Sequence, residues 1–290
     1  MSRSRAMLTA LALALAACGQ AGTNTPAAGT SSTVAAAPTL TLTAGGATSR
    51  FTAADLLARP DAATLAIAGD PAYAQPMTYR AVPLRALLAS LHPDSADTLE
   101  FRATDGFVAQ LPRALIDGAA TPWIAVEDPA HPWPNLPGKT VSAGPFYLIW
   151  QNPERAHVSQ EQWPYQMASL SAVASPAQRW PALAVDTHAS AQARRGQAVF
   201  AANCLSCHKL AGAGEGAIGP DLMRPMPATS YFTDAGLRAM IRNPAAVRTW
   251  PEQHMPAFNA DTISDADVNA VIAYLHSIAA RPSHSATERR

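Results

Sequence analysis

The segment Cys204-Leu205-Ser206-Cys207-His208 decides how the last third of this chain folds. Its spacing, two cysteines separated by two residues and followed at once by a histidine, is the attachment pattern of a c-type haem. The two thiols add to the vinyl groups of the porphyrin, and the adjacent imidazole ligates the iron from one side of the ring. We therefore predict one covalently bound haem c, with Cys204 and Cys207 as the thioether residues and His208 as the proximal iron ligand.

A structural zinc site and a redox-active dithiol are the two other interpretations of these residues. A structural zinc site usually draws four cysteine or histidine ligands, and the chain has three cysteines and no second paired cluster. A thioredoxin-like pair does not need the histidine that follows Cys207, and it lies between a strand and a helix rather than after a helical segment. The pattern therefore favours haem over both alternatives.

The N-terminal segment has the pattern of an export signal. Two arginines precede an apolar run from Ala6 to Ala17, which is too short to span a membrane. The run ends in Leu15-Ala16-Ala17-Cys18, which resembles the lipobox of bacterial lipoproteins, although ordinary cleavage after small residues is an alternative. The resemblance implies that residues 1–17 are a signal peptide and that Cys18 is lipid-modified, so we expect a periplasmic protein anchored to a bacterial membrane.

Composition divides the rest of the chain into four parts and a tail. Residues 18–38 are small or polar with no charged side chain, which predicts a flexible tether behind the lipidated cysteine. Residues 39–174 mix strand and helix patterns and predict an α+β domain. A linker is expected at residues 175–187, an all-α domain at residues 188–280, and a disordered tail at residues 281–290.

The strand predictions for the α+β domain come from short apolar alternations and, later in the domain, from two strand-like runs. They predict strands at Thr39–Thr43, Leu65–Ile67, Leu99–Thr104, Phe107–Leu111, Trp123–Val126 and Phe146–Trp150. Asp105-Gly106 is a common two-residue hairpin turn and predicts that the two strands on either side of it pair. Leucines at helical spacing from Leu84 to Leu91 predict a helix that begins behind Pro83.

Three segments of this domain resemble the molybdopterin-binding fold of the sulfite-oxidase superfamily: Val82-Pro83-Leu84, Thr104-Asp105-Gly106-Phe107 and Gly144-Pro145-Phe146-Tyr147-Leu148. In that family a cysteine thiolate ligates molybdenum. No cysteine lies between Thr39 and Asp186, and a soft thiolate is the ligand that such a centre needs. We therefore expect no molybdopterin here and predict a scaffold or docking role, because a fold can persist without its site.

Residues 188–280 resemble a class I cytochrome c. A helical apolar stripe runs into Cys204, and Ser264-Asp265-Ala266-Asp267 predicts the capped start of a final helix. In the family these two terminal helices cross, and the resemblance implies that they approach each other at Gly196. It also implies the proximal loop, because Gly219-Pro220-Asp221-Leu222 is similar to a family motif in which the proline segment packs on the histidine and a backbone carbonyl accepts its second ring proton.

The distal iron ligand is less sharply defined by the sequence. Met255-Pro256-Ala257-Phe258 resembles the family's distal Met-Pro-x-Phe turn, which implies that Met255 is the sixth ligand. His254 is the main rival, since a bis-histidine site needs a shift of one residue. Three further methionines follow the motif and stay as weaker alternatives: Met223, Met226 and Met240.

Charge limits the class of partner. Residues 188–280 carry seven basic and seven acidic side chains, and residues 39–187 carry nine basic and thirteen acidic ones, which excludes nucleic acid. We expect an electron-transfer protein rather than an enzyme, passing single electrons between an oxidoreductase and a respiratory acceptor. The alternative is a molybdopterin-dependent oxidoreductase whose electrons leave through the fused cytochrome. A haem sensor would need an open sixth position, which a methionine ligand at residue 255 disfavours.

Overall fold

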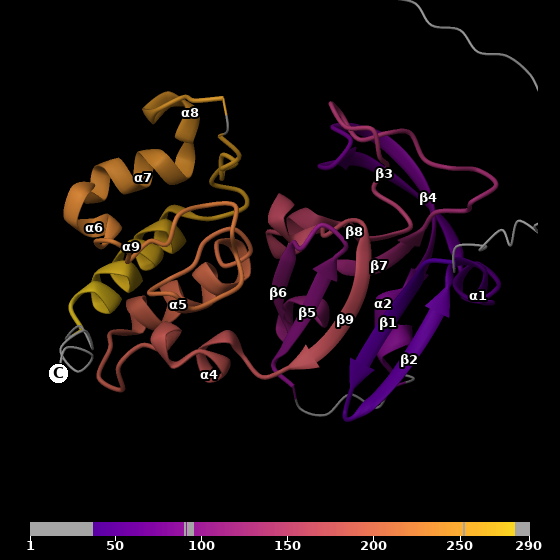
Figure 1. Ribbon diagram of the computed structural model, residues 1–290, viewed down its shortest axis with the longest axis horizontal. Helices are drawn as coiled ribbons and strands as arrows, with labels where there is room; N and C mark the ends of the chain where they lie inside the picture. The colour runs from indigo at the N-terminus through magenta and orange to yellow at the C-terminus, as the bar shows by residue number, and fades with distance from the viewer. Residues whose placement is uncertain (1–36, 90, 92–95, 252, 282–290) are drawn as a thin grey trace, which may run out of the picture. The chain divides into compact units, whose positions relative to one another are not determined.

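The computed structural model describes residues 37–89, 91, 96–251 and 253–281. The predicted signal peptide, Cys18, nearly all of the tether and most of the tail lie outside these described residues. Ala37–Arg290 belong to one compact unit, in which a β-rich region is followed along the chain by a helical region (Figure 1). This two-part architecture confirms the predicted order of a strand-containing domain followed by an all-α domain.

The first sheet of the β-rich region has five strands in the order β2-β1-β9-β5-β6. Strand β9 lies between its two partners, parallel to β1 and antiparallel to β5, so the last strand of the region joins two hairpins. The strands are β1 (Thr39–Ala44), β2 (Ala47–Thr52), β5 (Thr98–Ala103), β6 (Val108–Pro112) and β9 (Met167–Val173).

The second sheet is antiparallel, in the order β3-β4-β7-β8. Its strands are β3 (Ala63–Asp70), β4 (Gln75–Pro83), β7 (Thr121–Val126) and β8 (Phe146–Gln151). Short helices connect the strands: α1 (Ala53–Leu57), α2 (Leu84–Ala89), α3 (Arg113–Ile116), and the 3-10 turns η1 (Pro153–Ala156) and η2 (Gln160–Gln162).

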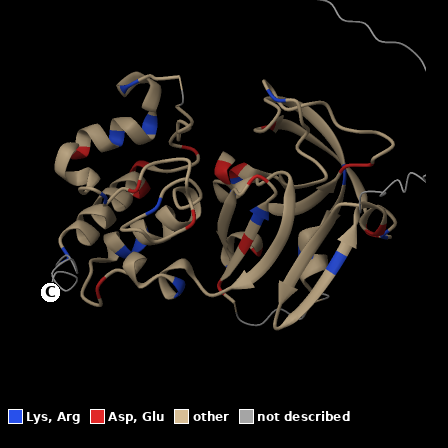
Figure 2. Ribbon diagram, viewed as in Figure 1, with Lys and Arg blue, Asp and Glu red and all other residues tan. Residues whose placement is uncertain are grey.

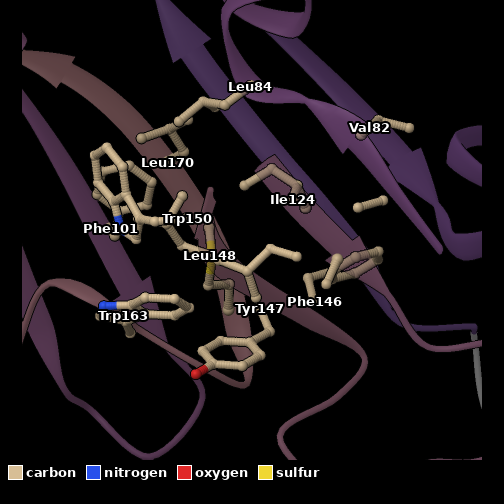
Figure 3. Close-up of a cluster of buried hydrophobic side chains, with 14 of the residues drawn as sticks. Val82, Leu84, Phe101, Ile124, Phe146, Tyr147, Leu148, Trp150, Trp163 and Leu170 are labelled. Carbon is tan, nitrogen blue, oxygen red and sulfur yellow. The ribbon is translucent and has the colours of Figure 1, made fainter. Parts of the chain in front are cut away.

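Apolar side chains from both sheets meet in one core (Figure 3). Phe101 and Leu170 come from the first sheet, while Ile124 and Trp150 come from the second, and each is at most 1% exposed. The Trp150 indole is satisfied inside this core, because its Nε1 donates to the carbonyl oxygen of Gln162 at 2.8 Å. The two sheets therefore pack against each other through this core, and β5 and β8 are buried along nearly their whole length.

The sequence predicted most of these strands but not every boundary. The connection between β5 and β6 spans residues 104–107 rather than the two residues Asp105-Gly106, because Ala103 N donates to Phe107 O and closes the turn. Helix α2 ends at Ala89, before the predicted position Leu91, which is nevertheless buried. Strands β2, β4 and β9 have no counterpart in the predictions from the sequence.

The helical region contains α4 (Pro176–Arg179), η3 (Pro181–Leu183), α5 (Ala191–Asn203), α6 (Ala228–Tyr231), α7 (Asp234–Arg242), α8 (Pro244–Val247) and α9 (Asp265–Ala279). The expected linker, residues 175–187, therefore carries two short turns of helix. Among the described residues, no helix has the length and apolarity needed to cross a membrane.

Helices α5 and α9 pack directly against each other (Figure 1). The contact is close at Gly196, where an added Cβ would lie 1.9 Å from the carbonyl oxygen of Ala270. Only a residue without a side chain fits at this point. The predicted approach of the two helices at Gly196 is therefore confirmed, and it fixes the end of α5, where the cysteines begin.

Candidate haem site

The two cysteines lie in a turn that helix α5 places. The Ser190 hydroxyl accepts from Ala193 N at 3.1 Å and caps the start of this helix. Cys204 ends it, with its N–H donated to Phe200 O at 2.8 Å. Because the backbone N–H groups of Cys207 and His208 both donate to Cys204 O, at 3.1 and 2.8 Å, the chain turns tightly and holds both thiols and the imidazole on one short segment.

The proximal loop holds the imidazole of His208 in one orientation. Its Nδ1 lies 2.8 Å from the carbonyl oxygen of Pro220. A carbonyl can only accept, so Nδ1 carries the proton and the lone pair of Nε2 is free for iron. Burial lowers the pKa of His208, which favours the neutral ring that a metal requires. The hydrogen bond implied by the family resemblance is therefore present.

Glycines let this loop approach the cysteine turn. Gly219 N donates to Cys207 O at 2.9 Å, and a Cβ at Gly219 would lie only 2.4 Å from Cε1 of His208. The Asp221 carboxylate fixes the other side of the loop by accepting from the backbone N–H groups of Ala211 and Gly212, at 2.9 and 2.6 Å. The loop is thus shaped around the imidazole.

Both thiols suit covalent attachment to a porphyrin. Cys204 and Cys207 are free, and burial raises the pKa of each to about 12, so both stay protonated at neutral pH. Within the described part of the chain, no group of three or more His, Cys, Asp or Glu side chains could hold a metal ion by itself. The zinc alternative therefore lacks its ligand set, whereas two thiols beside one oriented imidazole fit haem c.

The distal candidates lie in an irregular segment between α8 and α9. Met255 is half-buried there, and the segment is tied to helix α7 because Phe258 N donates to Ile241 O at 3.1 Å. The Arg242 guanidinium also donates to Phe258 O, at 2.8 Å. Among the described residues no hydrogen bond joins His208 to Met255 or to His254. His254 is exposed and lines one cavity together with Cys207, and the choice between His254 and Met255 stays a prediction.

The other three methionines that follow the haem motif differ in their surroundings. Met223 is half-buried against the core of the helical region, Met226 is 49% exposed, and Met240 lies half-buried on α7. None of these three methionines is the first residue of a Met-Pro-x-Phe sequence.

Residues 191–275 match the family model described as cytochrome C oxidase, cbb3-type, subunit III. The matched residues include α5, the cysteine turn, the proximal loop and most of α9, and they make up less than a third of the chain. The match supports a cytochrome c domain in this region, which implies a haem cofactor, an electron-transfer role and redox partner proteins. No curated protein matches the chain.

Charged side chains connect the β-rich region to this domain, and no pattern in the sequence predicts these contacts. Arg102 on β5 forms an ion pair with Glu215, which follows the cysteine turn, at 2.5 Å. Arg179 on α4 bonds both Glu215 and Glu100, so two guanidiniums and two carboxylates alternate. Elsewhere, acidic and basic residues are interspersed over both regions (Figure 2).

Glu161 in η2 is a further residue near the haem motif that the sequence did not predict. Its Oε2 lies 3.7 Å from Sγ of Cys207, although 46 residues separate the two along the chain. Burial raises the pKa of this carboxyl group. In the sequence, Glu161 shows only as part of a local capping box, Ser159 to Gln162, so no spacing pattern could have linked it to the haem motif.

Proposed function

We propose that this protein is a monohaem cytochrome c that passes single electrons between an oxidoreductase and a respiratory acceptor. The observation that carries the proposal is the hydrogen bond from His208 to Pro220 O, in the same short segment as two free thiols. Bound haem supplies one-electron exchange at its iron. The residues present can hold it: Cys204 and Cys207 through their sulfurs, and His208 through Nε2.

Each residue has a separate task in this proposal. The thioether sulfurs keep the cofactor in place in both oxidation states. Pro220 O keeps the imidazole oriented and increases its basicity. The basicity of this ligand affects the redox potential of bound iron. Met255 would be the second protein ligand of the haem iron, and a filled set of ligands would let the protein transfer electrons without binding a substrate at iron.

Covalent attachment is tested by replacing the cysteines singly. In Cys204→Ala and Cys207→Ala we expect little or no haem to stay with the chain after acid-acetone extraction and denaturing electrophoresis, whereas the unaltered protein retains one haem per chain. Cys18→Ala is the matched control, since it removes the third cysteine and leaves the haem pattern intact. Free extraction of haem from the unaltered protein would contradict the assignment.

The export and anchoring part of the proposal rests on the sequence before residue 37. Lipid on Cys18 would hold the protein on a bacterial membrane facing the periplasm, the compartment in which c-type haem is attached. Metabolic labelling with a clickable fatty acid should mark the protein, and Cys18→Ala should lose both the label and the membrane association. Membrane association without label would point to a protein partner instead.

The β-rich region is proposed to act as a docking or scaffold domain that binds no molybdopterin. Its lack of a cysteine supports this, because the alternative oxidoreductase needs a thiolate for molybdenum. Elemental analysis of the purified full-length protein separates the two functions. Iron without stoichiometric molybdenum is expected, and about one molybdenum per haem would establish the oxidoreductase in its place.

A further inference from the structure

Residues 152–166, which we call the β8–β9 connection, belong to the β-rich region and contact the cytochrome domain at two separate places. The connection is itself held by the core of the β-rich region. Val158 is 7% exposed within that core, and Leu148 N on β8 donates to Pro164 O at 3.0 Å. The β8–β9 connection is therefore a fixed part of the β-rich region rather than a free loop.

Ser159 joins the β8–β9 connection to the end of helix α5. Ser159 is 1% exposed, and its hydroxyl donates to Oδ1 of Asn203 at 2.7 Å. Asn203 is the last residue of α5, directly before Cys204, and its own Nδ2 donates to Val199 O at 2.9 Å. A buried hydrogen bond is costly to break, so this pair holds the connection against the residue that precedes the cysteine turn.

His157 joins the same connection to the distal side of the candidate haem site. Its Nδ1 lies 2.6 Å from the carbonyl oxygen of Asp261, and 104 residues separate the two along the chain. A carbonyl can only accept, so Nδ1 carries the proton and donates. Asp261 belongs to the distal segment, residues 253–263, which also contains His254 and Met255 and forms no helix or strand. Hydrogen bonds to neighbouring elements therefore decide where this segment lies.

The backbone of His157 has a conformation that side chains seldom adopt. Its φ is 50°, in the left-handed region, and the φ of Asn152 at the other end of η1 is 54°. Such conformations cost free energy and persist where the surrounding structure holds them. The residue that reaches the distal segment is thus also a strained one, as expected for a turn that is held in place by this contact.

The β8–β9 connection also borders the space that haem needs. Glu161 and Trp163 line a cavity of about 500 Å³. Cys207 and His254 line the same cavity, so haem bonded to the sulfur of Cys207 would extend into it. The connection therefore lies beside the haem space as well as against the two segments that carry the haem-binding residues.

We propose that the β8–β9 connection is a brace that fixes the distal segment relative to the cysteine turn, with His157 and Ser159 as its positioning residues. This inference rests on the proposed electron-transfer function. Both candidates for the second iron ligand, Met255 and His254, belong to the distal segment, so the brace acts on either one. When the bond from His157 to Asp261 breaks, the segment moves more freely and its ligand leaves the iron more often.

Two substitutions at His157 separate its hydrogen-bond donor from its backbone. His157→Gly keeps the left-handed conformation accessible and removes the donor. His157→Asn also suits this conformation and supplies an amide N–H in place of the ring N–H. His131→Gly is the matched control, because His131 is an exposed histidine of the β-rich region whose ring contacts Asp128 in its own loop.

Imidazole added to the ferric holoprotein can ligate the iron only after the protein ligand from the distal segment has left. Its binding rate, followed by stopped-flow absorption, should therefore reach a limit at high imidazole concentration. We expect His157→Gly to raise this limiting rate about fivefold, the effect of one hydrogen bond, and His157→Asn to restore most of the original rate. The His131→Gly protein should behave as the unaltered protein does.

Amide hydrogen exchange measures the same opening without using the iron as a probe. The N–H of Phe258 in the distal segment donates to Ile241 O, and it should exchange about fivefold faster in the His157→Gly holoprotein. The N–H groups of strand β5 should be unaffected. Ser159→Ala removes the other contact of the brace and should raise the limiting imidazole rate in the same direction. Because His157 is exposed, the comparison at residue 157 decides the question even if Ser159→Ala fails to fold.

Equal limiting rates and equal exchange in His157→Gly and the unaltered protein overturn the inference. It is also overturned if His157→Asn is as fast as His157→Gly, since the donor would then have no effect. A different result would contradict the proposed function itself: an imidazole rate in the unaltered protein that rises linearly without a limit would show that no residue of the distal segment ligates the iron.

Discussion

Nδ1 of His208 lies 2.8 Å from the backbone carbonyl oxygen of Pro220. The acceptor belongs to the main chain, so no side-chain substitution at Pro220 removes it directly. The contact depends instead on how closely the loop approaches the ring. Gly219 sets that approach, because a Cβ there would lie 2.4 Å from Cε1 of His208.

Gly219→Ala should therefore displace the imidazole or the loop. We expect a lower yield of holoprotein and a loss of about 2 kcal/mol in its free energy of unfolding, within the range that overpacking costs. Denaturant titration followed in the haem absorption band measures the second quantity. Gly69→Ala is the control, since an added Cβ there meets nothing within 4 Å. Equal stability of the two variants would show that the loop has room to adjust.

Met255→Leu should open the sixth coordination position. The ferrous variant is then expected to bind carbon monoxide, which the unaltered protein excludes, and absorption difference spectra detect the complex. Met255→His should lower the midpoint potential, because methionine is the axial ligand that raises it. Met226→Leu serves as the control at an exposed methionine. If His254→Ala binds carbon monoxide and Met255→Leu does not, the histidine is the ligand.

Local patterns predicted those parts of the fold that depend on neighbouring residues. The capped start of α9 is an example, since the Ser264 hydroxyl accepts from Asp267 N at 3.1 Å as the sequence indicates. Strand β9 was missed because its residues are mostly small and its burial does not alternate. It exists through pairing with β1 and β5, which lie far away in the sequence, and no local signal encodes such pairing.

The difference between local patterns and long-range packing also applies to the candidate haem site. Cys204, Cys207 and His208 belong to one short motif, so their spacing carried the prediction. Glu161 meets Cys207 only through the packing of two regions, and its own neighbours in sequence give it no special chemistry. The charge cluster around Glu215 was missed for the same physical reason.

Gly196→Ala tests the packing that positions the cysteine turn. Alanine stabilises a helix interior by about 1 kcal/mol relative to glycine. Here the added Cβ would meet Ala270 O, so we expect a net loss of about 1–3 kcal/mol. Thermal unfolding of the holoprotein measures it. Gln192→Ala, on the exposed face of α5, should change stability by less than about 0.5 kcal/mol. A Gly196→Ala protein as stable as this control would contradict the close crossing.

The last prediction concerns the pH dependence of stability through Glu100. This side chain is 5% exposed, and burial alone would raise its pKa. Hydrogen bonds from Gln110 and Arg179, with the charges of Arg179 and Arg102, outweigh burial and hold the pKa of Glu100 below its usual range. The folded protein therefore releases this proton more readily than the unfolded chain. The stabilisation is present above the ordinary glutamate pKa, about 4.3, and is lost as the pH falls through the lower folded value.

Glu100→Gln should consequently lower the free energy of unfolding by about 2 kcal/mol at pH 7, because Arg179 and Arg102 lose the buried carboxylate and keep only the partly exposed Glu215 as an acidic partner. The difference from the unaltered protein should shrink as the pH falls from about 4.3, where Glu100 of the unfolded chain takes up its proton, to the lower pH at which the folded carboxylate does so. Urea titrations across this pH range measure both quantities. Glu154→Gln, at an exposed glutamate, should show neither effect. A pH-independent difference between Glu100→Gln and the unaltered protein would mean that the charge of Glu100 does not stabilise the junction between the β-rich region and the cytochrome domain.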